Sequence, residues 1–237
     1  MKTLFKYATV VLLLAGAAAC SQPSKRASII DENIAVAEKQ IGMLADSSET
    51  GGVIRIPSTW KNGRIDYVPV DDWVSGFFAG TLWYMYELTG DEAWAARARK
   101  HTEILDSVQY LQWHHDVGFM VYDSYGNGLR LKNIPGYEDV IVQTAKSLAT
   151  GVIQSWDADR GWQGERGWQC PVIIDNMMNL ELMFKATEFS GDSTYYNIAV
   201  KHADRTMKEH FRDDYSCYHV VDYDLTTGDV RGRCPAQ

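Results

Sequence analysis

Two aspartates of the sequence stand in surroundings suited to proton transfer. Asp175 follows an apolar run, residues 172–174, and Asp116 follows a pair of histidines. An apolar neighbourhood raises the pKa of a carboxyl group toward neutrality, where the group can donate a proton and then act as a base. Each residue also has an ordinary structural interpretation: Asp175 as the N-cap of a helix that begins at Asn176, and Asp116 as a turn residue before Gly118. From residue type alone, the capping role is the more common one for Asp175.

Metal binding by His114, His115 and Asp116 is a competing interpretation of the same segment. Adjacent histidines point in different directions, and they lack the i, i+4 spacing that places two imidazoles on one helix face. We therefore predict no metal at this segment and no cofactor in the protein.

The composition describes a globular protein rich in aromatic side chains. Of 237 residues, 46% are hydrophobic and 12% aromatic, which excludes a disordered tail or a collagen-like repeat. A formal net charge of -8 argues against nucleic acid as a partner. The eight Trp and 13 Tyr suit a large core, and their flat faces also suit sugar ligands.

A long-period repeat organises the middle of the chain. Residues 82–101 and 183–202 align without a gap, and each copy has the pattern of helix, glycine turn and helix. Thr89 or Ser190 is expected to cap the second helix, with Glu92 at capping-box spacing in the first copy. The repeated histidines are expected to be structural. The identical pairs are Glu87 and Glu188, Gly90 and Gly191, Asp91 and Asp192, Ala98 and Ala199, Lys100 and Lys201, and His101 and His202.

Further helical stretches complete an all-α pattern. Residues 33–45 and 139–156 have apolar positions at helical spacing, and the second stretch lies halfway between the repeat copies. The unit is therefore a helical hairpin of about fifty residues, which stacks into a solenoid or closes into an α/α toroid. Long loops rich in Trp, Tyr, Gly and Asp favour the toroid, of which about four hairpins fit after Cys20. Short strands are expected only at 118–124 and 218–224.

The N-terminus has the pattern of a secretory signal. A basic start precedes the apolar run 7–19, which is too short for a membrane span of ~20 residues. The three alanines before Cys20 resemble a bacterial lipobox, whose cysteine becomes lipidated. We therefore expect a signal peptide at 1–19, a lipidated tether at 20–29 and the folded domain at 30–237. The lipid at Cys20 is expected to attach the protein to the membrane of the bacterial envelope, facing the periplasm.

The other cysteines suggest neither a zinc site nor a complete disulfide framework. The spacing of Cys170, Cys217 and Cys234 fits no zinc ribbon, and an odd number leaves at least one cysteine unpaired within the chain. In an oxidising compartment, a bridge from Cys234 to either of the other two remains open.

Four motifs lie in the loops and in the first turns of the expected helices. They are DW-x-x-GF-x-x-G-x-LW-x-x-YE-x-TGD at 72–91, HHD-x-GF at 114–119, IID-x-x-x-NL at 173–180, and YH with a following aromatic and a TG turn at 218–228. In this order and spacing they closely resemble the unsaturated glucuronyl hydrolases, glycoside hydrolase family 88. The resemblance runs from about residue 30 to the end of the chain, and the combination is far more specific than any single motif.

The resemblance implies a fold, an activity and a set of site residues. The fold is an (α/α)6 toroid, and the activity is removal of a 4,5-unsaturated uronic acid from the non-reducing end of oligosaccharides left by polysaccharide lyases. Asp175 becomes the general acid and base, and Asp116 becomes the second carboxylate of the site. The residues implied in substrate binding are Trp73, His115, Trp156 and His219.

The chain also departs from the family pattern. The family continues past Gln237 with a segment that carries an arginine and a Gly-Gln-Ala-Trp stretch. We therefore expect an incomplete ring, shortened by roughly a third to two-fifths, and weak or no turnover by this chain. Two alternatives stay open: an unsaturated rhamnogalacturonyl hydrolase of similar fold, and a non-catalytic envelope glycan-binding lipoprotein. Retention of both aspartates argues against the binding protein.

Overall fold

The computed structural model describes residues 25–150 and 167–235, which belong to two compact units. The first unit covers residues 1–44, and its described part is the helix α2 (Lys25–Ser48), which ends inside the second unit. No helix in the described part of the chain is long and apolar enough to span a membrane. The elements of the second unit are η1 (Thr50–Gly52), β1 (Ile56–Lys61), β2 (Arg64–Val68), α3 (Ser75–Thr89), α4 (Glu92–Glu103), η2 (Asp106–Tyr110), α5 (Val117–Val121), η3 (Tyr122–Gly126), α6 (Asn127–Lys132), α7 (Tyr137–Ala149), β3 (Cys170–Ile173), η5 (Ile174–Asn179), α9 (Leu180–Ser190), α10 (Ser193–Glu209), β4 (Val220–Tyr223) and β5 (Val230–Cys234).

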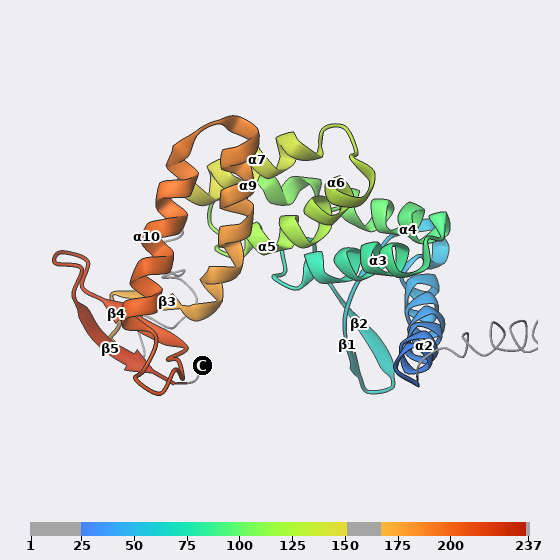
Figure 1. The fold of residues 1–237 in the computed structure, drawn as a ribbon, viewed down its shortest axis with the longest axis horizontal. Helices are drawn as coiled ribbons and strands as arrows, with labels where there is room; N and C mark the ends of the chain where they lie inside the picture. The colour runs from blue at the N-terminus through green and yellow to red at the C-terminus, as the bar shows by residue number, and fades with distance from the viewer. Residues whose placement is uncertain (1–24, 151–166, 236–237) are drawn as a thin grey trace, which may run out of the picture. The chain divides into compact units, whose positions relative to one another are not determined.

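The predicted repeat is confirmed as two helical hairpins, α3 with α4 and α9 with α10 (Figure 1). Gly90 ends α3 with φ 70°, and Gly191 ends α9 with φ 72°. Glycine adopts this left-handed conformation without a steric penalty, which lets the chain reverse in a tight turn. The N–H of Gly90 donates to the carbonyl of Tyr86 at 2.8 Å, and that of Gly191 to Thr187 at 2.9 Å. The two copies therefore share their backbone hydrogen bonds as well as their residues.

The caps of the second helices differ from the prediction. Asp91 caps α4 by accepting the N–H of Ala93, and Asp192 caps α10 by accepting the N–H of Thr194. The predicted cap, Thr89, is instead the last residue of α3, and its hydroxyl donates to the carbonyl one turn earlier. The capping prediction was wrong because Thr89 stays helical, whereas an N-cap residue has an extended backbone, as Asp91 does.

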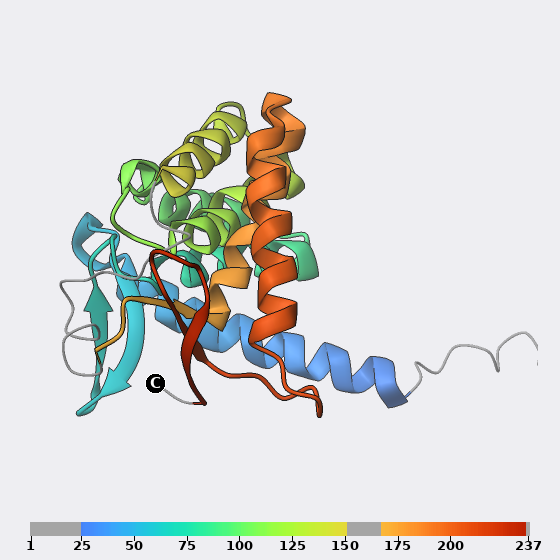
Figure 2. The same cartoon turned by 90° about the vertical axis from the view of Figure 1, so that its left-hand side faces the viewer.

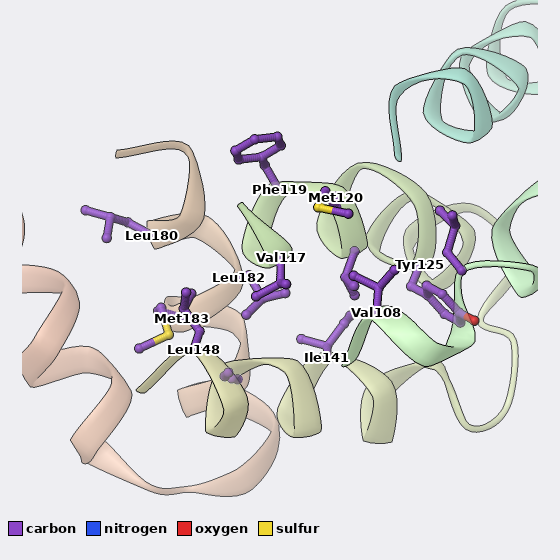
Figure 3. Packing of buried hydrophobic residues seen from close by; sticks show 14 of the residues in the cluster. Val108, Val117, Phe119, Met120, Tyr125, Ile141, Leu148, Leu180, Leu182 and Met183 are labelled. Atoms are coloured by element: carbon purple, nitrogen blue, oxygen red, sulfur yellow. The ribbon is translucent and has the colours of Figure 1, made fainter. Parts of the chain in front are cut away.

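The core of the second unit forms where α7 and α9 pack against α5 and η2 (Figure 3). Ile141, Ala145 and Leu148 of α7 are at most 1% exposed and follow the helical spacing predicted for this segment. Leu182 and Met183 of α9 are fully buried against them. Each aliphatic side chain buried in this way contributes about 1.5–3 kcal/mol. These contacts hold the helices whose ends carry the site.

The segment predicted as a strand at 118–124 is helical, so that prediction was wrong. It forms α5 and continues into a single π turn, η3. All side chains of α5 are buried, with Met120 and Val121 at 0% exposure, so no alternation or helical periodicity marks the sequence. Gly76 of α3 lies directly against the backbone of Met120, and a Cβ atom there would overlap it.

Two small antiparallel sheets accompany the helices. β1 and β2 form a hairpin around Asn62 and Gly63, both with positive φ. β4 lies between β3 and β5, and it confirms the strand predicted within 218–224. Both sheets lie on the same side of the helices of this unit (Figures 1 and 2).

The described part of the structure contains neither of the two disulfides that the sequence left open. Cys170 on β3 pairs with one end of β4, and Cys234 on β5 pairs with the other end. With β4 between them, their Cα atoms lie beyond the ~7 Å limit for a disulfide. Cys217 is exposed and forms no disulfide within the described residues. Neither candidate bridge is therefore present.

Candidate active site

Asp116 lies at the start of α5, in a segment that the core buries. The residue is 6% exposed, and Val117 after it is fully buried. Asp116 occupies the N-cap position of α5, yet its side chain makes no capping hydrogen bond. No hydrogen bond from the described residues reaches its Oδ1 atom. Oδ1 has therefore left water without accepting a hydrogen bond that would stabilise the charge of the carboxylate.

Asp175 is placed by the three-stranded sheet. The N–H of Ile174 donates to the carbonyl oxygen of His219 at 2.9 Å, which extends the pairing of β3 with β4. This register brings the second predicted aspartate next to a predicted substrate-binding histidine. Asp175 lies inside η5, and the N-cap positions of η5 and α9 are Ile173 and Asn179. The helix-cap interpretation of Asp175 is therefore wrong.

Carboxyl groups from two other segments act on Asp116. The pKa of Asp116 is raised to about 7, first by burial and then by the negative charges of Asp175 and Asp72. Burial also raises the pKa of Asp175. A backbone hydrogen bond and the nearby His219 lower this pKa, but the effect of burial is larger. Burial and the neighbouring negative charges oppose ionisation of Asp116, so near neutral pH a large share of the molecules keep the proton on this carboxyl group.

Two residues of this site had no role in the sequence analysis. Asp72 precedes α3, and its Oδ1 accepts the N–H of Val74 at 3.0 Å. Asn179 is 2% exposed, and its Nδ2 donates to the carbonyl of His115 at 2.8 Å. Both stand inside the motifs at 72–91 and 173–180, and that position was the sequence signal for them.

The histidine pair surrounds Asp116 without forming a plausible metal site. Nε2 of His115 lies 3.2 Å from Oδ1 of Asp116, and Nδ1 of His114 lies 3.9 Å from its Oδ2. Ligand atoms of the three residues lie within 4.8 Å of one another. Nδ1 of His114, however, accepts the backbone N–H of Asp116 at 3.1 Å, so its lone pair is already used. The donor set therefore does not fit a metal ion, for which each ligand must offer a lone pair.

Aromatic side chains flank these residues. Trp73, next to Asp72, is 54% exposed and meets the ring edge of Phe77 at 6.0 Å. Phe77 in turn stacks on Phe119 of α5 at 5.7 Å. Trp113, which sequence reasoning did not single out, is 46% exposed and packs against the ring of His114. Exposed indole faces beside buried carboxyl groups are suited to holding a sugar ring.

Five of the predicted site residues can be compared with the structure. It brings Asp116 and His115 together with Asp175 and His219, and it places Trp73 beside a carboxyl group that acts on Asp116. Trp156 lies outside the described residues, as does the predicted lipidation site, Cys20.

The chain is similar to curated hydrolases. An unsaturated glucuronyl hydrolase of Formosa agariphila is 47% identical over 173 residues, which are 69% of this chain and 42% of that protein. An unsaturated chondroitin disaccharide hydrolase of Streptococcus pyogenes is 32% identical over 186 residues, 74% of this chain and 45% of that protein. The chain thus spans about half the length of the curated relatives it matches. No protein-family model matches it.

Solved structures agree with the sequence relatives. The crystal structure of an unsaturated glucuronyl hydrolase specific for heparin matches with a TM-score of 0.76 and 38% identity, over 85% of this chain and 53% of that one. An unsaturated glucuronyl hydrolase from a Bacillus strain matches with a TM-score of 0.66 and 26% identity, over the same shares of the two chains. The fold is that of the helical hairpins of an α/α toroid, as in these solved hydrolase structures. Within that class, the chain belongs to the unsaturated glucuronyl hydrolases, glycoside hydrolase family 88.

Proposed function

We propose that the protein removes a 4,5-unsaturated uronic acid from the non-reducing end of oligosaccharides produced by polysaccharide lyases. The observation that carries this proposal is a pair of carboxyl groups, that of buried Asp116 and that of half-buried Asp175, whose pKa values are both raised. The negative charge of Asp175 is one cause of the raised pKa of Asp116. The relatives named as unsaturated glucuronyl hydrolase and unsaturated chondroitin disaccharide hydrolase support the substrate class.

The chemistry needs one acid that can also serve as a base. The substrate is a vinyl ether, and protonation of C4 by the carboxyl group of Asp175 leaves positive charge on C5 and the ring oxygen. The resulting carboxylate then takes a proton from a water molecule as the water oxygen bonds to C5, which restores the acid. The hemiketal so formed opens and releases the remaining sugar. Asp116 shares the retained proton with Asp175, which keeps a protonated acid present near neutral pH.

The substrate contacts follow from the surroundings of the two carboxyl groups. We assign His115 and His219 to the polar groups of the uronate, since the first lies beside Asp116 and the second beside Asp175. Trp73 presents an exposed ring for stacking on the sugar. Trp156 is proposed for the same task on the basis of the family motif.

A non-catalytic glycan-binding protein is the alternative from another class. Binding a sugar needs aromatic faces and hydrogen-bond donors, but it does not need an acid with a pKa near 7. The raised pKa of Asp116 and the action of the Asp175 carboxylate on it therefore favour the enzyme. An unsaturated rhamnogalacturonyl hydrolase would share this chemistry, and a comparison of substrates separates the two enzymes.

The substitution Asp175→Asn in the full-length protein tests the catalytic proposal. Asparagine keeps the size of the side chain but cannot deliver a carboxylic proton, so the rate should fall by about 10²–10⁴-fold while the disaccharide still binds. The measurement is the loss of ultraviolet absorbance as the C4–C5 double bond of a lyase-generated disaccharide is consumed. Asp139→Asn, at an exposed position of α7, is the matched control and should keep full activity. An Asp175→Asn protein with a normal rate would refute the assignment.

We also propose that Cys20 is lipidated and anchors the protein to the bacterial envelope, facing the periplasm. The support is the alanine-rich sequence before Cys20 and the apolar run that precedes it. Wild-type protein from a bacterial host should partition into detergent, and Cys20→Ser protein should stay in the aqueous phase. A wild-type protein without lipid would show that this proposal is wrong.

A further inference from the structure

The side chain of Asn179 joins the two segments that carry the catalytic aspartates. Its Nδ2 donates to the carbonyl of His115 at 2.8 Å, and its Oδ1 accepts the backbone N–H of Phe119 at 3.2 Å. Asn179 ends η5, which contains Asp175, and these two bonds bracket Asp116 on the other segment. Buried at 2% exposure, the amide has both of its polar ends satisfied by one loop more than fifty residues away in sequence.

The hydrogen bond to Phe119 replaces one that Asp116 would normally make. Asp116 stands at the N-cap of α5, and Phe119 is the third residue of that helix. An aspartate at an N-cap usually accepts the N–H of the second or third helical residue. Here the amide oxygen of Asn179 occupies the N–H of Phe119, and the side chain of Asp116 makes no capping bond. Asn179 thus caps α5 from another element.

Gly118 supplies independent support for the same contact. A Cβ atom at Gly118 would lie 2.8 Å from the Cβ of Asn179 and 2.9 Å from its Cα, closer than side chains approach one another. The φ of Gly118 is not in the left-handed region, so backbone conformation does not require glycine there. What requires it is the space taken by Asn179.

We propose that Asn179 is a positioning residue of the active site, which holds the Asp116 segment against the Asp175 segment and keeps the Asp116 carboxyl group from capping α5. The proposal rests on the function proposed above. It adds a task for a residue that contacts no reacting atom: the amide leaves Asp116 available to share a proton instead of fixing it as a helix cap.

The charged and titratable groups around Asp116 come from every neighbouring element. Asp175 acts on it from η5, and Asp72 acts on it from the turn before α3. His114 and His115 lie beside it on its own segment. None of these groups is a backbone N–H at the start of α5, so none supplies the capping bond that the N–H of Phe119 would give. Losing Asn179 therefore changes the environment of Asp116 in one direction, because a bond from a helix N-terminus favours the carboxylate form.

The titration of Asp116 itself provides the test. The full-length protein is labelled with aspartate carrying carbon-13 in the side-chain carboxyl group, and the Asp116 signal is assigned from its absence in Asp116→Asn. In Asn179→Ala, and in Gly118→Ala, which pushes the amide away, we expect the Asp116 midpoint to fall by at least about one pH unit. In Asn179→Asp the acceptor for Phe119 is retained, so the midpoint should not fall.

A matched control separates this effect from general loss of an amide. Asn127 donates through Nδ2 to the carbonyl of Asp123, and Asn127→Ala should leave the Asp116 midpoint unchanged. An unchanged midpoint in folded Asn179→Ala and Gly118→Ala would overturn the proposal. The proposal would also be overturned if all the Asn179 and Gly118 variants unfolded while Asn127→Ala stayed folded. The hydrogen bonds of Asn179 would then serve folding alone.

Measuring kcat and KM gives a second test, which depends on the proposed function. We expect Asn179→Ala to lower kcat by about 10–100-fold with KM within about threefold, because the acid is misplaced while the sugar contacts remain. Asn127→Ala should change neither constant. A wild-type protein that consumed no unsaturated disaccharide would refute the proposed function, and the titration would still decide the role of Asn179.

Discussion

Replacing Asp116 with asparagine should remove a pH-dependent loss of stability from the folded protein. The pKa of Asp116 is raised to about 7 by burial and by two neighbouring carboxylates, above the ordinary value of 3.8. Below pH 3.8 the folded and unfolded states both hold the proton, so the favourable contribution of the neutral group is fully present. As the pH rises to about 7, the unfolded chain releases the proton while the folded state retains it. The contribution is therefore lost progressively across this window.

The size of the effect follows from the same two values. Each pH unit between 3.8 and about 7 changes the free energy of unfolding by about 1.4 kcal/mol, which amounts to about 4 kcal/mol over the window. Asp116 is 6% exposed, so solvent screens little of this effect. Asparagine has the same shape and does not titrate, so the Asp116→Asn variant should lack this part of the pH dependence.

Urea unfolding of both proteins at intervals from pH 4 to pH 8 measures the difference. The wild type should lose up to about 4 kcal/mol relative to Asp116→Asn as the pH rises. Other titrating groups, such as His202, whose pKa is lowered to about 4 by burial, cancel in the comparison. Asp139→Asn, at an exposed site, should run parallel to the wild type. Parallel profiles for the wild type and Asp116→Asn would refute the argument that burial and the neighbouring carboxylates raise the pKa of Asp116.

Local features of the fold lead to four further expectations. Gly191→Ala should lower the free energy of unfolding by about 1 kcal/mol in chemical denaturation, because φ 72° strains any residue with a Cβ atom. Asp192→Ala should lower it by about 1 kcal/mol through loss of the α10 cap, measured in the same way, and a neutral result would exclude the cap. Leu82→Ala, at a fully buried position, should reduce the stability by about 2–5 kcal/mol, visible as a lower Tm. Maleimide should modify exposed Cys217 in the native protein and buried Cys170 only after denaturation, as mass spectrometry of the labelled peptides would show.

Features that depend on neighbouring residues in the chain were predictable. The repeat showed the two helical hairpins, because the glycine turn and the helix spacing are local patterns that recur with the same sequence. The spacing of Ile141, Ala145 and Leu148 predicted the buried face of α7 for the same reason. The predicted cap of α4, Thr89, lies two residues before the observed cap, Asp91. Both residue types are good caps, and only the backbone conformation decides which of them leaves the helix.

Features that depend on which distant segments pack together were not predictable. The segment 118–124 is apolar on every side, so its pattern fits a buried strand as well as a buried helix. The sheet that sets Asp175 beside His219 joins strands far apart in sequence, and no local signal fixes that pairing. The sequence left a bridge from Cys234 to Cys170 open for the same reason, since only the strand order, with β4 between β3 and β5, separates these two cysteines.

The sequence by itself determined which residues form the candidate site. Its four motifs contain Asp116 and Asp175, together with Asp72 and Asn179, because chemistry requires particular side chains at particular places in the chain. Only the tertiary structure decided what these side chains do to one another. Burial and the neighbouring carboxylates raise the pKa of Asp116, and the amide of Asn179 takes the N–H that Asp116 would otherwise cap. Both effects arise between segments about sixty residues apart, where the dielectric environment and the hydrogen-bond partners exist only after the helices have packed.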